Sequence, residues 1–467
     1  MPFLLDQLPV MDTVIFGGFF LLSLLAVLFN HFARNTEHQK KSVSNTTFLS
    51  FQRSFFLVYF LALLGDWLQG PYVYKLYDYY GFRESQIAVL YVAGFASSVM
   101  FGTATGPLAD MIGRKKIALL FCVMYTFCCL TKLSPNYWIL MLGRILGGIS
   151  TSMLFSTFES WYVYEHTEHH GFPAEWIGVT FSTTTFWNGM LAIMSGVVAN
   201  FTAEGLGFGP VAPFVVAIFP LILCGMLVLK TWPENYGNRK HKLVASCMDG
   251  LKHIISDRKI FLLGAIQTMI ESCMYIFVFL WTPVMMPAHP PLGMVFASFM
   301  VAIMIGSSIY SLLLSKNYKS EDVLRVCLMI MCVSMGICCF TAKPDASMFD
   351  IFLTYASFIL LEVGIGMYFP AMSFVKSQVI PESHRANVMN WFRVPMNLIT
   401  CATLLCLHVP WIAEDKRIVF GACFVLVVLG FFTASAFLRE AKKGRENSSQ
   451  LGEQDDEAKV GLMSSAQ

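Results

Sequence analysis

Long runs of apolar residues, separated by short polar segments, extend over almost the whole chain. Runs of about 18 or more mostly apolar residues are long enough to cross a bilayer as helices. These runs are apolar on all faces, which excludes the alternating pattern of a transmembrane β-barrel. Because a helix satisfies its own backbone hydrogen bonds in lipid, the pattern predicts an all-α membrane protein. We expect thirteen helices, at 12–33, 52–75, 86–109, 117–133, 137–160, 178–203, 210–230, 260–284, 293–315, 322–341, 349–374, 387–408 and 418–438.

The composition agrees with this pattern. Of the 467 residues 56% are hydrophobic and 13% are charged, whereas about a quarter of the residues in an average soluble protein carry a charge. The mean hydropathy is +0.61. The chain therefore has too little charge to cover the surface of a soluble enzyme of this size.

The Lys and Arg residues predict how the helices are oriented. If the N-terminus lies outside, most of the 32 basic residues fall in inner segments, as the positive-inside rule requires. Residues 1–11 contain no Lys or Arg, so we interpret the first run as a retained helix and not as a signal peptide. The sequence predicts a multi-pass protein of the cell membrane with a cytosolic C-terminus.

The longest inner polar segment divides the chain into six plus six helices, with one extra helix in front. This is the arrangement of carriers built from two related halves. A weak repeat supports it, since Gly147–Gly148 in one half correspond to Gly364 and Gly366 in the other. The predicted parts are an extra helix with a basic linker (1–50), a first half (51–230), a basic cytosolic linker (231–259), a second half (260–438) and a disordered tail (439–467).

A charged loop with two glycines joins the second and third helices of the first half. It reads GPLADMIGRKK and contains Gly106, Asp110, Gly113 and Arg114. Glycine permits a tight turn, and Asp110 can hold Arg114 or a neighbouring helix end in one conformation. An ordinary positively charged inner loop is the alternative interpretation. The loop resembles the signature loop of the major facilitator superfamily, whose fold is a bundle of two six-helix halves.

Five longer segments narrow this resemblance to one branch. They read DWLQGPYVYKLY (66–77), FESWY (158–162), FPAEW (172–176), FLWTP (279–283) and NWFRVP (390–395). In these blocks the chain is similar to the molybdate-anion transporter branch, over essentially residues 50–440. The resemblance implies a secondary active transporter that takes up molybdate with high affinity by alternating access.

Six charged residues stand out within the predicted spans, and a charge at the bilayer centre costs at least about 2.5–3.5 kcal/mol. They therefore need partners or a water-filled cavity. Two are cations, Arg144 and Arg393, one in each half. The acids either carry protons, which would balance an incoming dianion, or pair with the arginines and release them during transport. The four acids are Asp66, Glu159, Glu271 and Glu362.

Molybdate is a tetrahedral dianion, and its binding needs cationic forks or clustered donors. We expect Arg144 and Arg393 to hold it, although each could instead pair with a carboxylate for structure. Asp66 is the favoured coupling or gating acid, followed by Glu362. Glu271 is a further candidate, as is Glu159, which also suits a structural role at the inner gate. Further donors to the substrate are expected from Trp67, Gln69, Tyr72, Asn188, Asn390 and Trp391.

Other activities find little support in the sequence. Three histidines within 166–170 could bind Zn²⁺, but a solvated polar loop is the favoured interpretation. No phosphate-binding loop, nucleophile elbow or HExxH motif occurs, so neither an enzyme nor a resident cofactor or metal is expected. The expected partners are molybdate, protons and the lipid bilayer, without nucleic acid, for a monomer. A carrier of another solute, such as sulfate or an organic anion, and a non-transporting membrane sensor remain the alternatives.

Overall fold

The computed structural model describes residues 8–33, 45–173, 175–237, 251–380 and 385–464. This part of the chain is helical and contains no strand. The predicted basic linkers lie largely outside it, at 34–44 and 238–250. Thirteen described helices have 18 residues or more: α2 (Leu8–Ala33), α4 (Thr46–Trp67), α6 (Glu84–Ile112), α7 (Arg114–Thr131), α8 (Tyr137–Tyr164), α9 (Glu175–Asn200), α10 (Ala212–Thr231), α12 (Arg258–Met285), α13 (Leu292–Ser315), α14 (Ser320–Thr341), α15 (Met348–Val379), α16 (Arg385–Leu405) and α18 (Lys416–Ser464).

Each predicted apolar run corresponds to one of these helices, so the prediction of thirteen helices is confirmed. Within the described residues, ten of them are long and apolar enough to cross a membrane. The other three, α7, α9 and α16, are more polar: α7 begins with three basic residues, α9 contains the run Ser182–Thr185, and α16 carries Arg393 near its middle.

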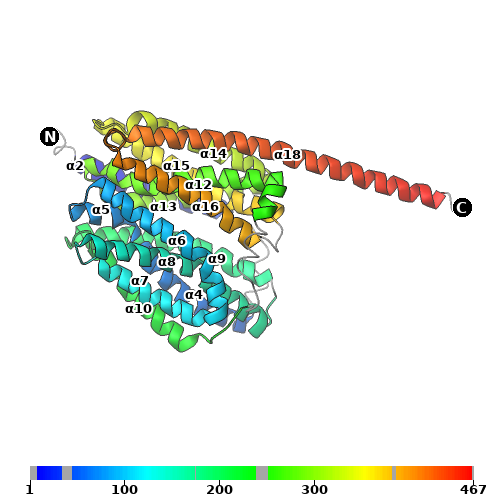
Figure 1. Cartoon of the computed structure of the whole chain (residues 1–467), viewed down its shortest axis with the longest axis horizontal. Coiled ribbons are helices and arrows are strands. Elements are labelled where there is room, and N and C mark those ends of the chain that lie inside the picture. Colours follow the sequence, from blue (N-terminus) through cyan, green and yellow to red (C-terminus); the bar gives the residue numbers. More distant parts are fainter. Residues whose placement is uncertain (1–7, 34–44, 174, 238–250, 381–384, 465–467) are drawn as a thin grey trace.

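The helices form two bundles that lie side by side (Figure 1). The first bundle contains α4 and α6–α10, and the second contains α12–α16 and α18. The bundles meet where α9 packs on α13 and α6 packs on α16. The extra helix α2 packs on α13 of the second bundle, with Ala26 of α2 beside Val301 and Ile305. The fold is therefore a bundle of two six-helix halves with one extra helix.

Glycines allow the same pair of helices to approach closely in both halves. A Cβ atom on Gly148 of α8 would lie 2.3 Å from the backbone oxygen of Gly94 in α6. In the second half, a Cβ atom on Gly366 of α15 would lie 2.1 Å from the backbone oxygen of Ile303 in α13. Small residues at such crossings let the backbones of membrane helices touch. The weak repeat of glycines in the sequence thus reflects equivalent crossings in the two halves.

The last helix extends beyond the bundle. The sequence predicts disorder from residue 439, whereas α18 continues as a helix to Ser464 and projects away from the other helices (Figure 1). The segment after 438 is rich in polar and charged residues.

The two ends of the molecule differ. We call the end where α6 meets α7 the linker end, and the end that carries the short helix α5 (Val73–Tyr79) the opposite end. Ring contacts between the halves lie toward the opposite end, where Tyr74 and Tyr91 both pack on Phe279 (5.3 and 5.1 Å between centroids). An ion pair joins the halves at the same end, between Lys416 and Glu84 (2.6 Å).

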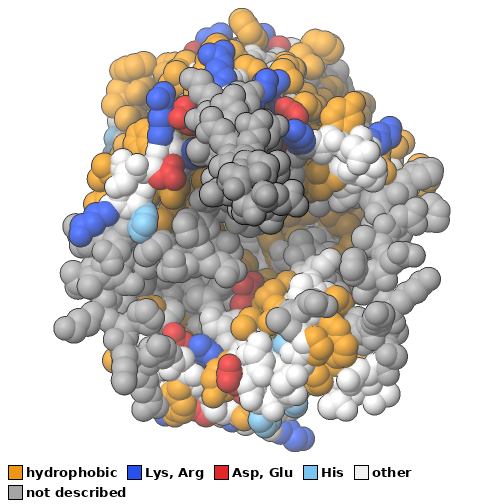
Figure 2. Space-filling view, turned by 90° about the vertical axis from the view of Figure 1, so that its right-hand side faces the viewer, with side chains coloured by type: hydrophobic (Ala, Val, Ile, Leu, Met, Phe, Trp, Pro, Cys, Tyr) orange, Lys and Arg blue, Asp and Glu red, His pale blue; other side chains and the backbone are white. Residues whose placement is uncertain are grey.

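Between the described parts of the two halves, the linker end is open. Figure 2 views this end and shows a hollow at its centre, with an acidic side chain at the edge of the hollow. Among the described residues, no ion pair joins the two halves at this end. The structure is therefore closed at the opposite end and open at the linker end, as expected for one of the two states of an alternating-access carrier.

Candidate functional site

A cluster of charged and polar side chains lies in the second half, on three helices. Glu271 of α12 faces Lys376 of α15, with 4.0 Å between the carboxylate oxygen and Nζ. Tyr368 of α15 and Gln267 of α12 donate hydrogen bonds to the same carboxylate, at 3.4 and 3.0 Å. Arg393 of α16 lies close enough to interact electrostatically with Glu271. We call these five residues the α12–α15–α16 cluster.

The cluster lies near the seam between the halves. Tyr275 is one turn beyond Glu271 on α12, and its ring packs on Phe95 of α6 in the first half (5.2 Å between centroids). Lys376 is buried, at 9% exposure, whereas Arg393 is exposed. The arrangement therefore contains one carboxylate and two cations, which leaves a net positive charge where the two halves meet.

The sequence analysis missed Lys376 because it ended the predicted helix at residue 374. The helix continues to Val379, which brings Lys376 into its last turn instead of a loop. The spacing held a usable signal, since Tyr368 and Lys376 are eight residues apart and so lie on one face of a helix. Lysine stems extend along apolar surfaces, which lets the ammonium group reach Glu271 from the helix end.

The predicted cation of the first half has different surroundings. Arg144 of α8 donates from Nε to the backbone oxygen of Leu90 in α6 (3.2 Å), and its guanidinium lies over the Tyr91 ring (4.7 Å to the centroid). No carboxylate pairs with it among the described residues. Because Tyr91 also packs on Phe279 of the second half, Arg144 lies against the seam, nearer the closed end.

Among the described residues, Glu271 is the one predicted intramembrane acid that pairs with a cation. Asp66 of α4 accepts a hydrogen bond from the hydroxyl of Tyr125 in α7. Glu362 of α15 is buried, at 5% exposure, and Glu159 of α8 is partly buried. Neither Glu362 nor Glu159 has a hydrogen-bond or ion-pair partner within the described ranges.

The predicted polar donors divide between two places. Trp67 donates from Nε1 to Oδ1 of Asn188 (2.8 Å), which joins α4 to α9. Gln69 is buried and donates to the backbone oxygen of Gly65 (2.9 Å). On α16, Asn390 and Trp391 are partly buried and lie within one turn of Arg393.

Tyr72 lies at the closed end, in the short helix that follows Gln69. Its hydroxyl donates to Glu204 (2.7 Å), just beyond the end of α9. Within the part of the chain that the structure describes, its hydroxyl contacts Asn200 and Glu204 and neither Arg144 nor the α12–α15–α16 cluster. Its position therefore suits closing the opposite end better than contacting a substrate in the hollow.

The signature loop is held in one conformation at the linker end. Arg114 donates from Nε and Nη2 to Oδ1 of Asp110 (3.0 and 2.8 Å), as the sequence suggests. It also donates from Nη1 to the backbone oxygen of Ser160 in α8 (3.0 Å). Gly113 has a φ of +118°, a conformation that side chains rarely adopt. Gly106 lies inside α6, one residue before Pro107.

The chain after α10 completes this arrangement. The N–H of Arg114 donates to the backbone oxygen of Asn235 (3.0 Å), and the N–H of Lys115 donates to Glu234 (2.8 Å). Gly237 lies so close to Asp110 that a Cβ atom there would be 2.1 Å from the carboxyl carbon. The sequence analysis did not predict that residues 234–237 contact the signature loop, because nothing in the local pattern links residues 110 and 237.

Comparison with known proteins places these features in context. A family model described as sugar transporters with twelve transmembrane segments matches residues 14–361. The molybdate-anion transporter of Xenopus laevis is 45% identical over 415 residues, which cover 88% of this chain and 92% of the frog protein. That of Danio rerio is 45% identical over 390 residues, which cover 79% and 81% of the two chains.

Solved structures share the fold. The crystal structure of the nucleoside transporter NupG matches 83% of this chain and 98% of its own, with a TM-score of 0.63 and 12% identity. That of a D-xylose–proton symporter matches 83% and 97%, with a TM-score of 0.64 and 13% identity. At such low identity the likeness concerns the fold alone.

Proposed function

Because the chain belongs to the molybdate-anion transporter branch of the major facilitator superfamily, we propose that it carries molybdate across a membrane by alternating access. The family and the fold are those of carriers. The single observation that best supports an anionic substrate is the α12–α15–α16 cluster, where Lys376 and Arg393 outnumber the one carboxylate beside them.

The cluster suggests how part of its positive charge is balanced before the substrate binds. Without substrate, Glu271 forms an ion pair with Lys376. The oxygens of a bound molybdate ion would accept charge-assisted hydrogen bonds from Lys376 and Arg393 in place of Glu271. Arg144 would supply the contact from the first half, because it lies against the seam and has no carboxylate partner among the described residues. Closing the linker end would then bring the two halves together around the anion.

The basic residues support an orientation in which the linker end is cytosolic and the N-terminus lies outside. The signature loop carries three consecutive basic residues, Arg114 to Lys116, and the positive-inside rule places such loops in the cytosol. In this orientation the structure is the inward-open state, from which molybdate would leave for the cytosol.

Uptake of a dianion requires a source of free energy. Moving one negative charge into a cell against the membrane potential costs about 2.3 kcal/mol per 100 mV. A molybdate dianion would therefore cost about 4.6 kcal/mol at a potential of about 100 mV. Protons carried with the anion would remove this cost. Glu362 suits that role because it is buried with no partner in the described part of the chain, and a proton there relieves the cost of an unpaired charge. Asp66, which Tyr125 holds, is the second candidate.

The experiment that tests this function is molybdate accumulation in cells that lack their own uptake system. We expect accumulation that rises when external pH is lowered and that excess sulfate reduces only partly. Accumulation of sulfate without molybdate would assign the carrier to another anion. No accumulation of either anion by correctly inserted protein would favour a sensor.

Arg144 and Arg393 provide a test of the substrate site. We expect Arg144→Gln and Arg393→Gln each to reduce molybdate uptake strongly, because each removes a cationic donor at the seam. Arg144→Lys and Arg393→Lys keep the charge without the planar fork and should retain part of the uptake. Wild-type uptake by inserted Arg144→Gln and Arg393→Gln proteins would rule out these arginines as substrate ligands.

A further inference from the structure

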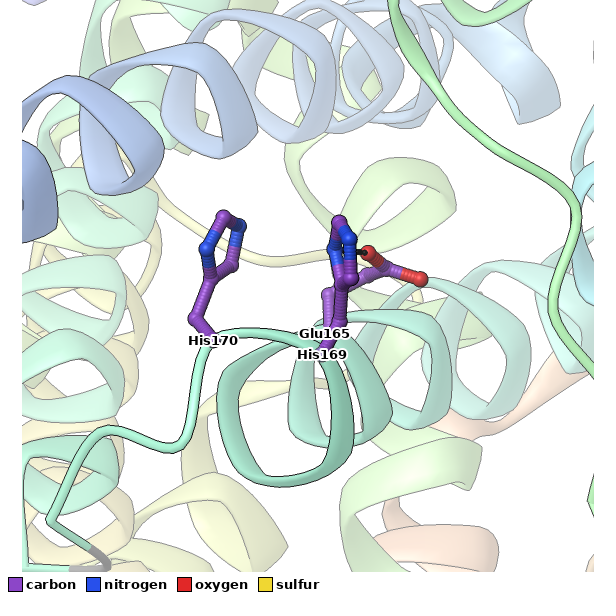
Figure 3. Close-up of side chains that lie close together, drawn as sticks. All are labelled: Glu165, His169 and His170. Carbon is purple, nitrogen blue, oxygen red and sulfur yellow. Dashed lines mark hydrogen bonds and ion pairs between the residues drawn. The ribbon is translucent and has the colours of Figure 1, made fainter.

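A group of metal-ligating side chains lies at the linker end, away from the proposed substrate site. Glu165, His169 and His170 each place one ligand atom within 4.8 Å of the others (Figure 3). They belong to a short π-helix (Glu165–His169) that continues α8, and to the residue after it. A π-helix has a wider turn than an α-helix, so residues four and five positions apart share one face.

We propose that Glu165, His169 and His170 form a binding site for a divalent transition-metal ion such as Zn²⁺. Two imidazoles and a carboxylate are a ligand set that such ions accept, with water completing the coordination. Ligand atoms about 2.0–2.1 Å from a tetrahedral Zn²⁺ lie roughly 3.3 Å apart. The Nδ1 atom of His169 and Oε2 of Glu165 are already 2.9 Å apart. A ring nitrogen of His170 already lies within 4.8 Å of both of these atoms, so a small shift would bring it into the same coordination sphere.

The carboxylate is held in place as a metal ligand would be. Glu165 is buried, at 3% exposure, and its Oε1 accepts a hydrogen bond from Nδ2 of Asn235 (2.9 Å). Partners of this kind orient metal ligands and typically account for about ten- to hundredfold in affinity. On the other side, the ring of Phe172 stacks on His170 (5.2 Å between centroids). Both arms of the site are thus positioned by neighbouring residues.

The third histidine of this segment does not take part. His166 is fully buried, and its two ring nitrogens face the hydroxyl of Tyr162 (3.2 Å) and the backbone oxygen of Pro173 (2.9 Å). It therefore has a structural role, in agreement with its burial against Phe48. The sequence alone does not show which of the three histidines are available for a metal.

The site is connected to the signature loop. Asn235, which orients Glu165, also accepts a hydrogen bond on its backbone oxygen from the N–H of Arg114. A metal ion on Glu165 would therefore stabilise the position of the chain after α10, which holds the loop. This inference is independent of the substrate, because none of the three ligands belongs to the α12–α15–α16 cluster.

Metal binding by the purified full-length protein tests the proposal, with a tag that contains no histidine. We expect calorimetry to give one Zn²⁺ per chain and the melting temperature to rise with Zn²⁺. Bound Co²⁺ should show the absorption bands of tetrahedral coordination. The double variant His169→Ala, His170→Ala should lose at least about tenfold in affinity, along with the thermal shift. Its melting temperature without metal should fall only slightly, since both side chains are exposed and Glu165 keeps its hydrogen bond from Asn235.

Two control variants test whether the loss of Zn²⁺ binding is specific to the proposed ligands. Glu168→Gln changes an exposed acid in the same segment, and His408→Ala removes an exposed histidine elsewhere. Both should bind Zn²⁺ like the wild type. Absence of binding by the wild type, or equal binding by the double variant, would overturn the proposal.

Discussion

Replacing Lys376 with glutamine is expected to lower molybdate uptake by about ten- to hundredfold, with unchanged amounts of inserted protein. A charge-assisted hydrogen bond contributes about 1.5–3 kcal/mol, which corresponds to this range. Lys376 is the buried cation of the cluster, and the loss of its charge would also leave Glu271 beside the incoming dianion. Initial uptake rates in intact cells, normalised to surface protein, measure the effect.

A second substitution separates substrate binding from simple neutralisation of Glu271. If Lys376 only neutralises Glu271, the double variant Lys376→Gln, Glu271→Gln should regain wild-type uptake. If Lys376 also holds the anion, uptake by the double variant should stay low, and this is the result we expect. Lys376→Arg should keep much of the uptake, and Lys319→Gln, at an exposed lysine, should behave as the wild type. Recovery by the double variant would remove Lys376 from the substrate site.

The sequence predicted the helices well because their signal is local. A span long enough to cross lipid must be apolar over most of its length, so each of the thirteen helices is visible without knowledge of its neighbours. The ion pair of Asp110 with Arg114 was predictable for the same reason, since the two residues are only four positions apart in the chain. The glycines at 148 and 366 were visible in the sequence only as a weak repeat, and their contacts on α6 and α13 emerge only from the fold.

The site was less predictable because its partners come from distant segments. Tyr125 lies 59 residues from Asp66, and no pattern in the sequence links the two. Lys376 was hidden by an error of a few residues at a helix end, where hydropathy is least informative. Arg144 was recognised as an intramembrane cation, but its contacts with Leu90 and the Tyr91 ring required the structure. The sequence thus identified the charged residues inside the spans, but not the residues that they contact.

A side chain at Gly366 is expected to prevent assembly of the second half. In Gly366→Val the new Cβ atom would lie 2.1 Å from the backbone oxygen of Ile303 and 2.8 Å from its carbonyl carbon. Both are backbone atoms of a neighbouring helix, so no rotamer change can relieve the overlap and α13 must move away from α15. Overpacking typically costs about 1–3 kcal/mol even where side chains can adjust. We therefore expect little or no monodisperse protein.

The equivalent crossing and a matched glycine make this result specific. Gly148→Val should have the same effect in the first half, because its Cβ atom would lie 2.3 Å from the backbone oxygen of Gly94. Gly421→Val in α18 is the control, since no atom outside its own helix backbone lies within 4 Å of a Cβ atom there. Size-exclusion profiles of fluorescent fusions in detergent measure all three variants. Wild-type profiles for Gly366→Val and Gly148→Val would mean that the helices of each crossing can separate without loss of the fold. Close contact at the two crossings would then not be required for the halves to assemble.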